Sequence, residues 1–371
     1  MPEIWLRYGT TDVVLDIKYE NLLTQISSNM QSLSDEEIKL TLSNVALTDN
    51  TLFVALSGSK SVATVVRLLA ESASVKGFKD TTVDVLPDLY EALRNNLIDS
   101  SVLLNRLEYK SLWERIKKFE STIFLCRTGY DPLFGFSGTP TILLRNFMPE
   151  PMLDAFTARN DDLPHGGVRT QPLKIAYSAM EKVSVRSIEV VANSAGIASI
   201  SYGGITEAFE DAIAHLTSGT QIELEKCKSA IISPSSEIEG QSTLTTTLNS
   251  LWNSYPIVKE NGSIILLAES LNGIGPGAIK MFVEGRLKLE ELQGNSFYAN
   301  GLEHLLYMNE LRQKYDLGIL STLPEYFLKT KLGFKTYKNM AEALEKLFTK
   351  HGKSHKVLVV SDADINLLKP K

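Results

Sequence analysis

The alternation of short apolar runs with helical stretches constrains the fold of this chain more than any other feature. In the last third, strand-sized apolar runs lie at residues 229–233, 263–268, 318–321 and 356–361. Between them, apolar side chains recur at helical spacing over residues 244–258, 278–287, 299–315, 324–332 and 340–350. Strands that alternate with helices form parallel sheets covered by helices on both faces. Residues 220–371 are therefore predicted to form a doubly wound α/β domain with a parallel sheet.

The first part of the chain predicts a further α/β domain with an additional layer. Apolar runs at 51–56 and 121–125 are typical of buried strands, and helical spacing follows the first of them. A pair of strands around a turn at 193–196, followed by a helix, predicts an α+β layer beside the parallel sheet. We place the domain boundary at residue 219, which gives domains 1–219 and 220–371 with a cleft between them. The remaining expected elements are strands at 4–8 and 13–17, and helices that begin near Ser34 or span 86–97, 109–118, 172–182 and 207–216.

Composition excludes several classes of protein. A chain of 371 residues, 43% of them hydrophobic, can bury the cores of two domains without disulfides. A net charge of −6 without long basic clusters argues against a nucleic-acid partner. Two distant cysteines, Cys126 and Cys227, suit a reducing compartment and give no disulfide framework. With no signal-peptide pattern and no apolar run of membrane-span length, we expect a soluble cytoplasmic protein without a membrane partner.

A small polar loop follows the first buried strand. Ser57, Ser59, Lys60 and Ser61 lie between that strand and a helix, where free backbone N–H groups and the helix dipole favour an anion. The glycine spacing of a Walker loop is absent. One interpretation is a site for a small anionic ligand, and the other is a serine-rich helix cap.

The most informative segment, residues 129–140, follows the strand at 121–125. Its three glycines, two prolines and several aromatic residues are typical of a pocket wall rather than of a connecting loop. Phe136, Ser137 and Gly138 are its candidate ligand-contacting residues. Ser137 is not expected to be a nucleophile, because the G-x-S-x-G elbow is not met and no His–Asp pair matches it. The segment has the composition of an active-site loop without chemically active side chains.

The histidines predict no metal site. Only His351 and His355 have a spacing that metal ligands use, and their basic, glycine-containing surroundings favour an exposed loop. His165 lies in a proline- and glycine-rich loop of active-site character, although a plain turn residue explains it as well. A glycine-rich loop at 271–277 either faces a ligand crevice or forms tight turns.

Several of these segments, in this order, resemble the nickel-dependent lactate racemase family. The resemblance runs from residue 1 to about residue 362. It rests on Tyr8-Gly9, Glu20 to Leu23, Asp131-Pro132, Gly135 to Gly138, Gly203-Gly204, and residues 258–269 with Gly273. It implies an N-terminal domain that holds a nickel-pincer nucleotide and a C-terminal domain that closes over it. The implied chemistry is hydride abstraction and return at the carbon of a 2-hydroxy acid, with a lysine that anchors the cofactor and histidines that bind nickel or move protons.

The residues that this chemistry needs are missing from the chain. The anchoring lysine falls on Thr139-Pro140-Thr141, and two histidines fall on Leu133 and near Phe156. The family's Asp-Arg-Pro signature is replaced by Ser57 to Lys60, its second catalytic lysine aligns near Asn249, and residues 76–90 contain no histidine. A tethered cofactor needs its lysine, nickel needs an imidazole, and proton removal needs a base. We therefore expect no bound cofactor and no catalytic or metal-binding residues.

The resemblance and the departures together predict a lactate-racemase-like protein that has lost its chemistry. Such a protein would act as a non-catalytic binding or assembly subunit, with a small anionic ligand, a protein partner or a second copy as its partner. The alternatives are an active, divergent 2-hydroxy-acid racemase or epimerase that uses the nickel-pincer cofactor or other residues, and an unrelated hydrolase or transferase reaction in the same cleft. The candidate ligand cleft comprises Ser57, Ser59, Lys60, Ser61, Phe136, Ser137, Gly138 and His165.

Overall fold

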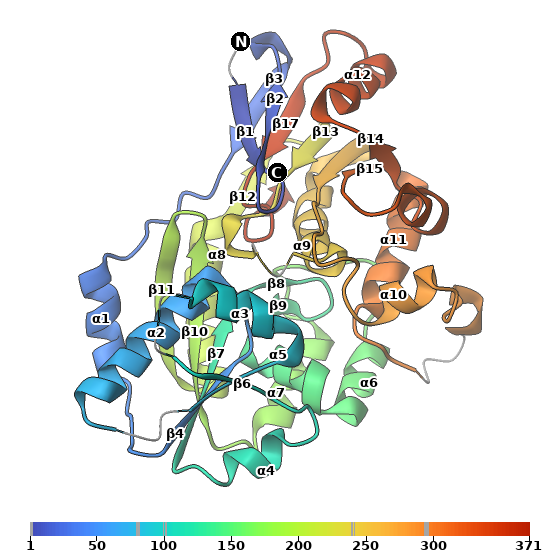
Figure 1. The fold of residues 1–371 in the computed structure, drawn as a ribbon. Helices are drawn as coiled ribbons and strands as arrows, with labels where there is room; N and C mark the ends of the chain where they lie inside the picture. Colours follow the sequence, from blue (N-terminus) through green and yellow to red (C-terminus); the bar gives the residue numbers. More distant parts are fainter. Residues whose placement is uncertain are drawn as a thin grey trace.

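The computed structural model describes residues 3–78, 82–98, 100, 102–238, 240, 242–292 and 297–371. It confirms the α/β class, with two six-stranded sheets whose strands alternate with helices along the chain (Figure 1). Among the described residues, no helix combines the length and the apolar character needed to cross a membrane.

The first sheet has the strand order β11-β10-β7-β4-β5-β6, parallel throughout except for the β10–β11 pair. The expected two-stranded layer is therefore present as the antiparallel edge of this sheet. Its strands are β4 (Thr51–Ala55), β5 (Thr82–Val85), β6 (Leu104–Arg106), β7 (Ser121–Arg127), β10 (Arg186–Asn193) and β11 (Gly196–Gly204).

Successive side chains of these strands point to opposite faces of the first sheet, and each face is covered by its own helices. Phe53, Ile123 and Val190 pack with α1 (Asp35–Ser43) and α2 (Lys60–Val75). Leu52 and Phe124 pack with residues from α4 and α5 on the other face. Figure 1 shows α1 and α2 on one side of the sheet and α5 to α7 on the other. The other helices of this part are α3 (Tyr90–Asn96), α4 (Leu112–Ile116), α5 (Thr139–Phe147), α6 (Pro149–Thr157), α7 (Gln171–Met180) and α8 (Ile205–Thr220).

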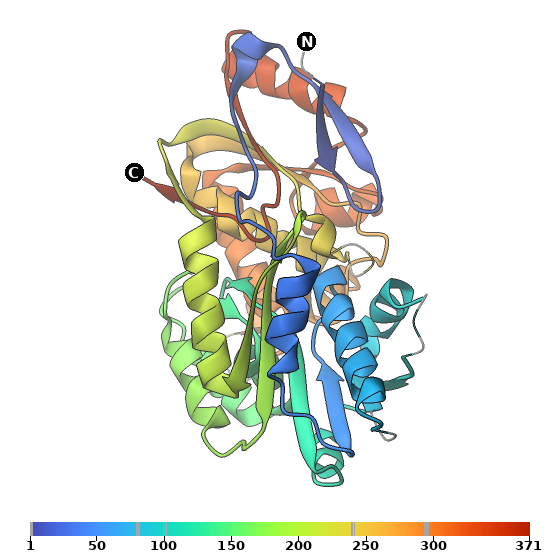
Figure 2. The ribbon, with the colours of Figure 1, turned by 90° about the vertical axis from the view of Figure 1, so that its left-hand side faces the viewer.

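The second sheet is parallel throughout, in the order β16-β15-β14-β13-β17-β3. One face packs against α9 (Leu244–Ser254), α10 (Ala278–Val283) and α11 (Leu302–Lys314). The other face is covered by α12 (Met340–His351) and by the hairpin of β1 (Glu3–Arg7) and β2 (Asp12–Asp16), as Figure 2 shows at the end of the molecule away from the first sheet. Its strands are β3 (Leu22–Ile26), β13 (Cys227–Ile232), β14 (Val258–Leu267), β15 (Asp316–Leu320), β16 (Lys335–Tyr337) and β17 (Val357–Val360).

The expected division into domains 1–219 and 220–371 does not separate the two sheets at the N-terminal end. Strand β3 pairs with β17, and the β1–β2 hairpin packs on the second sheet, so residues 3–26 lie with the C-terminal half. Sequence reasoning missed β3 because its side chains are only half buried and include polar ones. Strand β12 (Gln221–Leu224), which follows α8 directly, pairs with β18 (Leu367–Pro370).

The two halves share one hydrophobic core. A single cluster of buried side chains joins Phe156 and Phe209, from the first half, to Leu248, Trp252 and Leu311, from the second. A shared apolar core of this kind holds two halves in a fixed arrangement, because separating them would expose its surface to water.

Candidate functional site

The carboxyl ends of the parallel strands in both sheets face the junction between the two halves. Ligands of open parallel sheets bind beyond these ends. Here the loops that follow the strands bond to one another across the junction. Ser61 pairs with Glu237, Ser194 with Asp362, and Arg127 with Asp364.

The Ser57–Ser61 loop caps helix α2, and a carboxylate of the same chain binds at the N-terminus of that helix. The Ser59 hydroxyl accepts a hydrogen bond from Val62 N at 3.3 Å and caps α2, which confirms the cap interpretation. The backbone N–H of Ser61 donates to Oε2 of Glu237 at 3.1 Å. Ser57, Ser59 and Ser61 are all buried, and so is Glu237, which is 4% exposed. The Glu237 carboxylate, from the second half, thus lies where a small anion was expected.

Asp364 makes a second closed contact across the junction. Its Oδ1 accepts from the backbone N–H of Ser235 at 2.6 Å, and its Oδ2 accepts from Nη2 of Arg127 at 2.9 Å. The side chains of Arg127 and Asp364 are only 11% and 4% exposed. Charge-assisted hydrogen bonds between buried partners are stronger than exposed ones and hold the two strand ends together.

Residues 129–137 form a small hairpin of β8 (Gly129–Asp131) and β9 (Gly135–Ser137). Its aromatic side chains are part of the core rather than of a pocket wall. Tyr130, Phe134 and Phe136 are at most 2% exposed, and the rings of Tyr130 and Phe136 lie 5.8 Å apart. The candidate Phe136 is therefore a core residue, because the apolar rings fill the space between the two halves.

The glycines of this segment allow close packing. Gly135 has φ of 86°, and a Cβ there would lie 1.7 Å from the carbonyl oxygen of Val168. A Cβ at Gly138 would meet the ring of Phe209 at 2.3 Å and the Glu189 carboxylate at 2.9 Å. Ser137 is half buried between these glycines. The glycine pattern thus reflects contacts within the chain.

A buried carboxylate lies at the N-terminus of α5, beside the position expected for the family's anchoring lysine. Oε1 of Glu189 accepts from Thr139 N at 2.9 Å, and its Oε2 accepts from the Thr128 hydroxyl at 2.7 Å. Glu189 is fully buried. Burial raises the pKa of Glu189 to about 7, although the hydrogen bonds from Thr139 and Thr128 work to lower it. Thr139, Pro140 and Thr141 are themselves buried in the first turn of α5.

A buried group of charges, here called the Arg145 cluster, connects the two halves and comprises Arg145, Asp131, Tyr298 and Glu303. Both carboxylate oxygens of Asp131 accept from Nη2 of Arg145, at 3.0 and 2.8 Å. Nη1 of Arg145 donates to Glu303 at 2.5 Å and to the Tyr298 hydroxyl at 2.6 Å. The side chains of Arg145 and Asp131 are each 10% exposed, and that of Glu303 is fully buried.

The ionisation of this cluster follows from its pairing. Burial alone would raise the pKa of Glu303, but the charge of Arg145 outweighs it and lowers that pKa. Burial lowers the pKa of His304, and the neutral ring accepts the indole N–H of Trp252 at Nδ1, at 2.7 Å. Glu303 is therefore a carboxylate and His304 a neutral imidazole at neutral pH.

His165 lies in a surface pocket of about 360 Å³ at the tip of the β8–β9 hairpin. We call it the His165 pocket; its lining includes Leu133, Arg159, His165, Arg169, Thr170 and Lys174. The backbone N–H of His165 donates to the carbonyl of Pro132 at 2.8 Å, and the Thr170 hydroxyl donates to that of Leu133 at 3.0 Å. The ring of His165 is 2.7 Å from Oδ1 of Asp161.

The structure distributes the candidate residues over three places. The Ser57–Ser61 loop is at the closed junction, Phe136 to Gly138 are in or beside the core, and His165 is in the lining of the pocket of about 360 Å³. Sequence reasoning missed Arg145, Glu189 and Glu237. Only Glu189 carries a signal in the sequence, as a single carboxylate within the short run 188–192, whose other residues are apolar.

The reading of His351 and His355 as exposed loop residues is wrong. His351 ends α12, and His355 is 9% exposed with its Nε2 2.7 Å from the Ser229 hydroxyl. The expectation failed because the second sheet covers this turn. Over the described part of the chain, no group of three or more histidine, cysteine or acidic side chains is arranged to hold a metal.

These features define an α/β protein of two halves whose parallel sheets meet at their carboxyl ends. Neither models of protein families nor curated proteins match the sequence. Among solved structures, the chain is similar to the lactate racemase apoprotein from Thermoanaerobacterium thermosaccharolyticum, with a TM-score of 0.74 and 11% identity over 99% of this chain and all of that one. It is also similar to a protein from Thermotoga maritima, with a TM-score of 0.65 and 13% identity over 93% of this chain and all of that one. The chain therefore has a lactate-racemase-like fold.

Proposed function

We propose that this chain is a lactate-racemase-like protein that has lost nickel-pincer chemistry and binds a small anion in the His165 pocket. The observation that carries the first part is the Glu189 carboxylate at the N-terminus of α5. The proposal covers a binding role. The assembly role, with a protein partner or a second copy, stays a prediction.

The residues present do not fit the nickel-pincer nucleotide. Buried Thr139, Pro140 and Thr141 offer no amine to anchor a cofactor. The backbone N–H of Thr139, which could bind a phosphate oxygen, already donates to Glu189. A phosphate at this place would meet a second acidic group in a buried site, and such pairs disfavour each other strongly. Leu133 is 1% exposed and its carbonyl is already bonded to Thr170.

The lining of the His165 pocket favours an anion. Arg159 and Arg169 keep partners in Asp162 and Glu210, but the side chain of Lys174 forms no hydrogen bond or ion pair with the described residues. A lysine has three donors and no acceptor, so the pocket has an excess of donors. Its volume of about 360 Å³ suits a small metabolite. A carboxylate of the size of a 2-hydroxy acid matches both the excess of donors and the volume of the pocket. Lactate, which the name of the similar structure contains, is a 2-hydroxy acid.

Calorimetric titration with L-lactate tests this site. We expect saturable binding that weakens about tenfold in Lys174→Gln, the loss of one charge-assisted hydrogen bond. The matched control is Lys39→Gln, since Lys39 is an exposed lysine of α1 in the same half. Absence of binding to the unmodified chain, or an equal loss in both variants, would contradict the proposal.

A further inference from the structure

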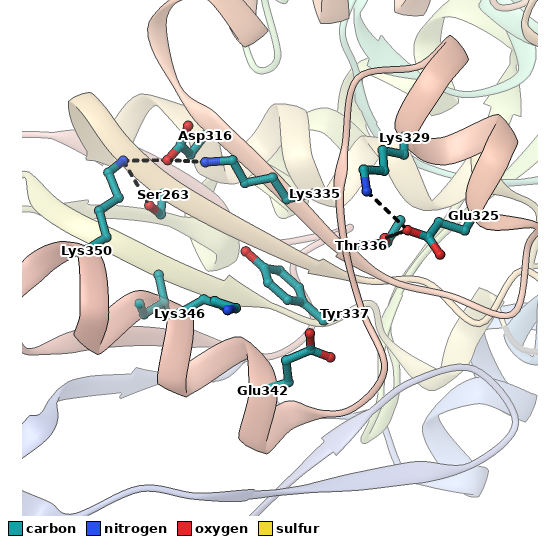
Figure 3. A pocket seen from close by; sticks show the side chains of 11 residues that line it. Ser263, Asp316, Glu325, Lys329, Lys335, Thr336, Tyr337, Glu342, Lys346 and Lys350 are labelled. Carbon is teal, nitrogen blue, oxygen red and sulfur yellow. Dashed lines mark hydrogen bonds and ion pairs between the residues drawn. The ribbon is translucent and has the colours of Figure 1, made fainter.

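A second pocket, of about 480 Å³, lies at the amino end of β15 and along the edge strand β16, beside α12. We call it the lysine pocket, after Lys329, Lys335, Lys346 and Lys350 in its lining. Figure 3 shows Lys335, from β16, and Lys350, from α12, turned toward Asp316, and Lys329, from the helical turn before β16, turned toward Glu325.

The carboxylates of the lysine pocket already have donors within the chain. Asp316 accepts from Lys335 and Lys350, at 2.7 Å each. Glu325 accepts from Lys329 at 3.5 Å and from the Thr336 hydroxyl at 3.2 Å. Glu342 accepts from the backbone N–H of Lys338 at 2.9 Å. The charges of Asp316 and Glu325 are thus balanced by lysines of the pocket, whereas the hydrogen bond to Glu342 leaves its negative charge in place.

Several donors of the lysine pocket lack acceptors. Lys350 uses its donors on Asn261, Ser263 and Asp316. Lys346 forms no side-chain hydrogen bond or ion pair with the described residues, and neither does the hydroxyl of Tyr337. Burial, with Asp316 and Glu342, raises the pKa of Tyr337, so this hydroxyl keeps its proton and remains a donor. Four lysines against three carboxylates leave the pocket with a net positive charge.

The Tyr337 ring has a fixed place in this pocket. It lies over Gly318, where a Cβ would come within 2.5 Å of Cε2 of the ring. Gly318 is directly opposite Lys335 in the β15–β16 pairing. The glycine therefore lets the ring lie flat against the sheet, and Figure 3 shows its hydroxyl between Lys335 and Lys346.

We infer that the lysine pocket binds a phosphate-bearing small molecule through Lys346, Lys335 and the Tyr337 hydroxyl. Phosphate offers several acceptor oxygens and carries more than one negative charge near neutral pH, which matches unpaired donors on more than one element. The pocket volume leaves room for the group that carries the phosphate. The site is independent of the His165 pocket and of the proposed function.

Calorimetric titration with inorganic phosphate at low salt tests the inference. We expect saturable binding that weakens about tenfold in Lys346→Gln and in Tyr337→Phe, and that declines as sodium chloride screens the charges. Lys346 is exposed, so its replacement leaves the folded chain intact, which an unchanged melting temperature verifies.

Two controls separate this site from others. Lys39→Gln removes an equivalent exposed charge on α1, and Lys174→Gln removes the free lysine of the His165 pocket. Both should bind phosphate as the unmodified chain does. No phosphate binding to the unmodified chain would overturn the inference, and so would a loss in Lys174→Gln as large as that in Lys346→Gln.

Discussion

Replacing Arg145 by methionine should lower the free energy of unfolding by about 3–5 kcal/mol, the range for removal of one partner from a buried ion pair. The loss arises because the two carboxylates that Arg145 pairs with stay buried in the variant. Asp131 and Glu303 would lose the cation that their carboxylates share and gain little access to water, since their side chains are only 10% and 0% exposed. Methionine restores most of the packing volume against Phe134, so the measured loss reports the charges. Urea unfolding followed by circular dichroism measures it.

Two further variants make this result interpretable. Arg67→Met removes an exposed arginine paired with Glu71 at 3.0 Å on α2, and should cost less than about 1 kcal/mol. Adding Asp131→Asn and Glu303→Gln to Arg145→Met removes the uncompensated charges and should recover part of the loss. A cost in Arg145→Met no larger than that in Arg67→Met would show that the cluster does not hold the halves together.

Glu189→Gln should make the chain more stable above neutral pH, by about 3 kcal/mol, and should leave it nearly unchanged near pH 4. Burial raises the pKa of Glu189 from 4.5 to about 7. Between these values the folded chain holds a proton that the unfolded chain has released, so stability falls as pH rises through this window. Glutamine is neutral throughout. Its carbonyl can accept from Thr139 N, and its amide can donate to the Thr128 hydroxyl.

The difference in unfolding free energy between Glu189→Gln and the unmodified chain, measured across this pH range, checks the prediction. Glu223→Gln is the matched control, because Glu223 is an exposed glutamate of β12. The difference in unfolding free energy between Glu223→Gln and the unmodified chain should not change with pH. If the difference for Glu189→Gln is also independent of pH, or if it grows toward acid pH, the result would contradict a raised pKa of the buried Glu189 carboxyl.

The sequence was sufficient to predict the two parallel sheets because their central strands are apolar runs bounded by helical stretches. Strands β4, β7 and β13 are buried almost along their whole length, so each stands out from its flanks. The short strands β5, β6 and β16 were missed because a few residues at or near a sheet edge carry little periodicity. Strand β3 was missed for the same reason, and its place beside β17 depends on pairing across more than 300 residues.

The candidate site was predicted in part. The segment at 129–140 does lie where the two halves meet, as its glycines and aromatic residues suggested, but its rings fill the core instead of lining a cleft. Sequence could not show that Glu237 would reach the N-terminus of α2, since 176 residues separate Glu237 from Ser61. Arg145 was equally hidden, because its partner Glu303 is 158 residues away. Such contacts arise only when the chain has folded.

The most direct test of the central proposal is the nickel content and intact mass of this chain after purification from cells that make the nickel-pincer nucleotide. A lactate racemase made in the same cells serves as the positive control. We predict the mass of the bare chain, 41.1 kDa, with nickel far below one atom per chain, because the segment that resembles the family's cofactor anchor carries buried Thr139, Pro140 and Thr141 and no lysine. A ratio near one nickel per chain, with the added mass of the cofactor, would contradict it and would favour an active, divergent racemase.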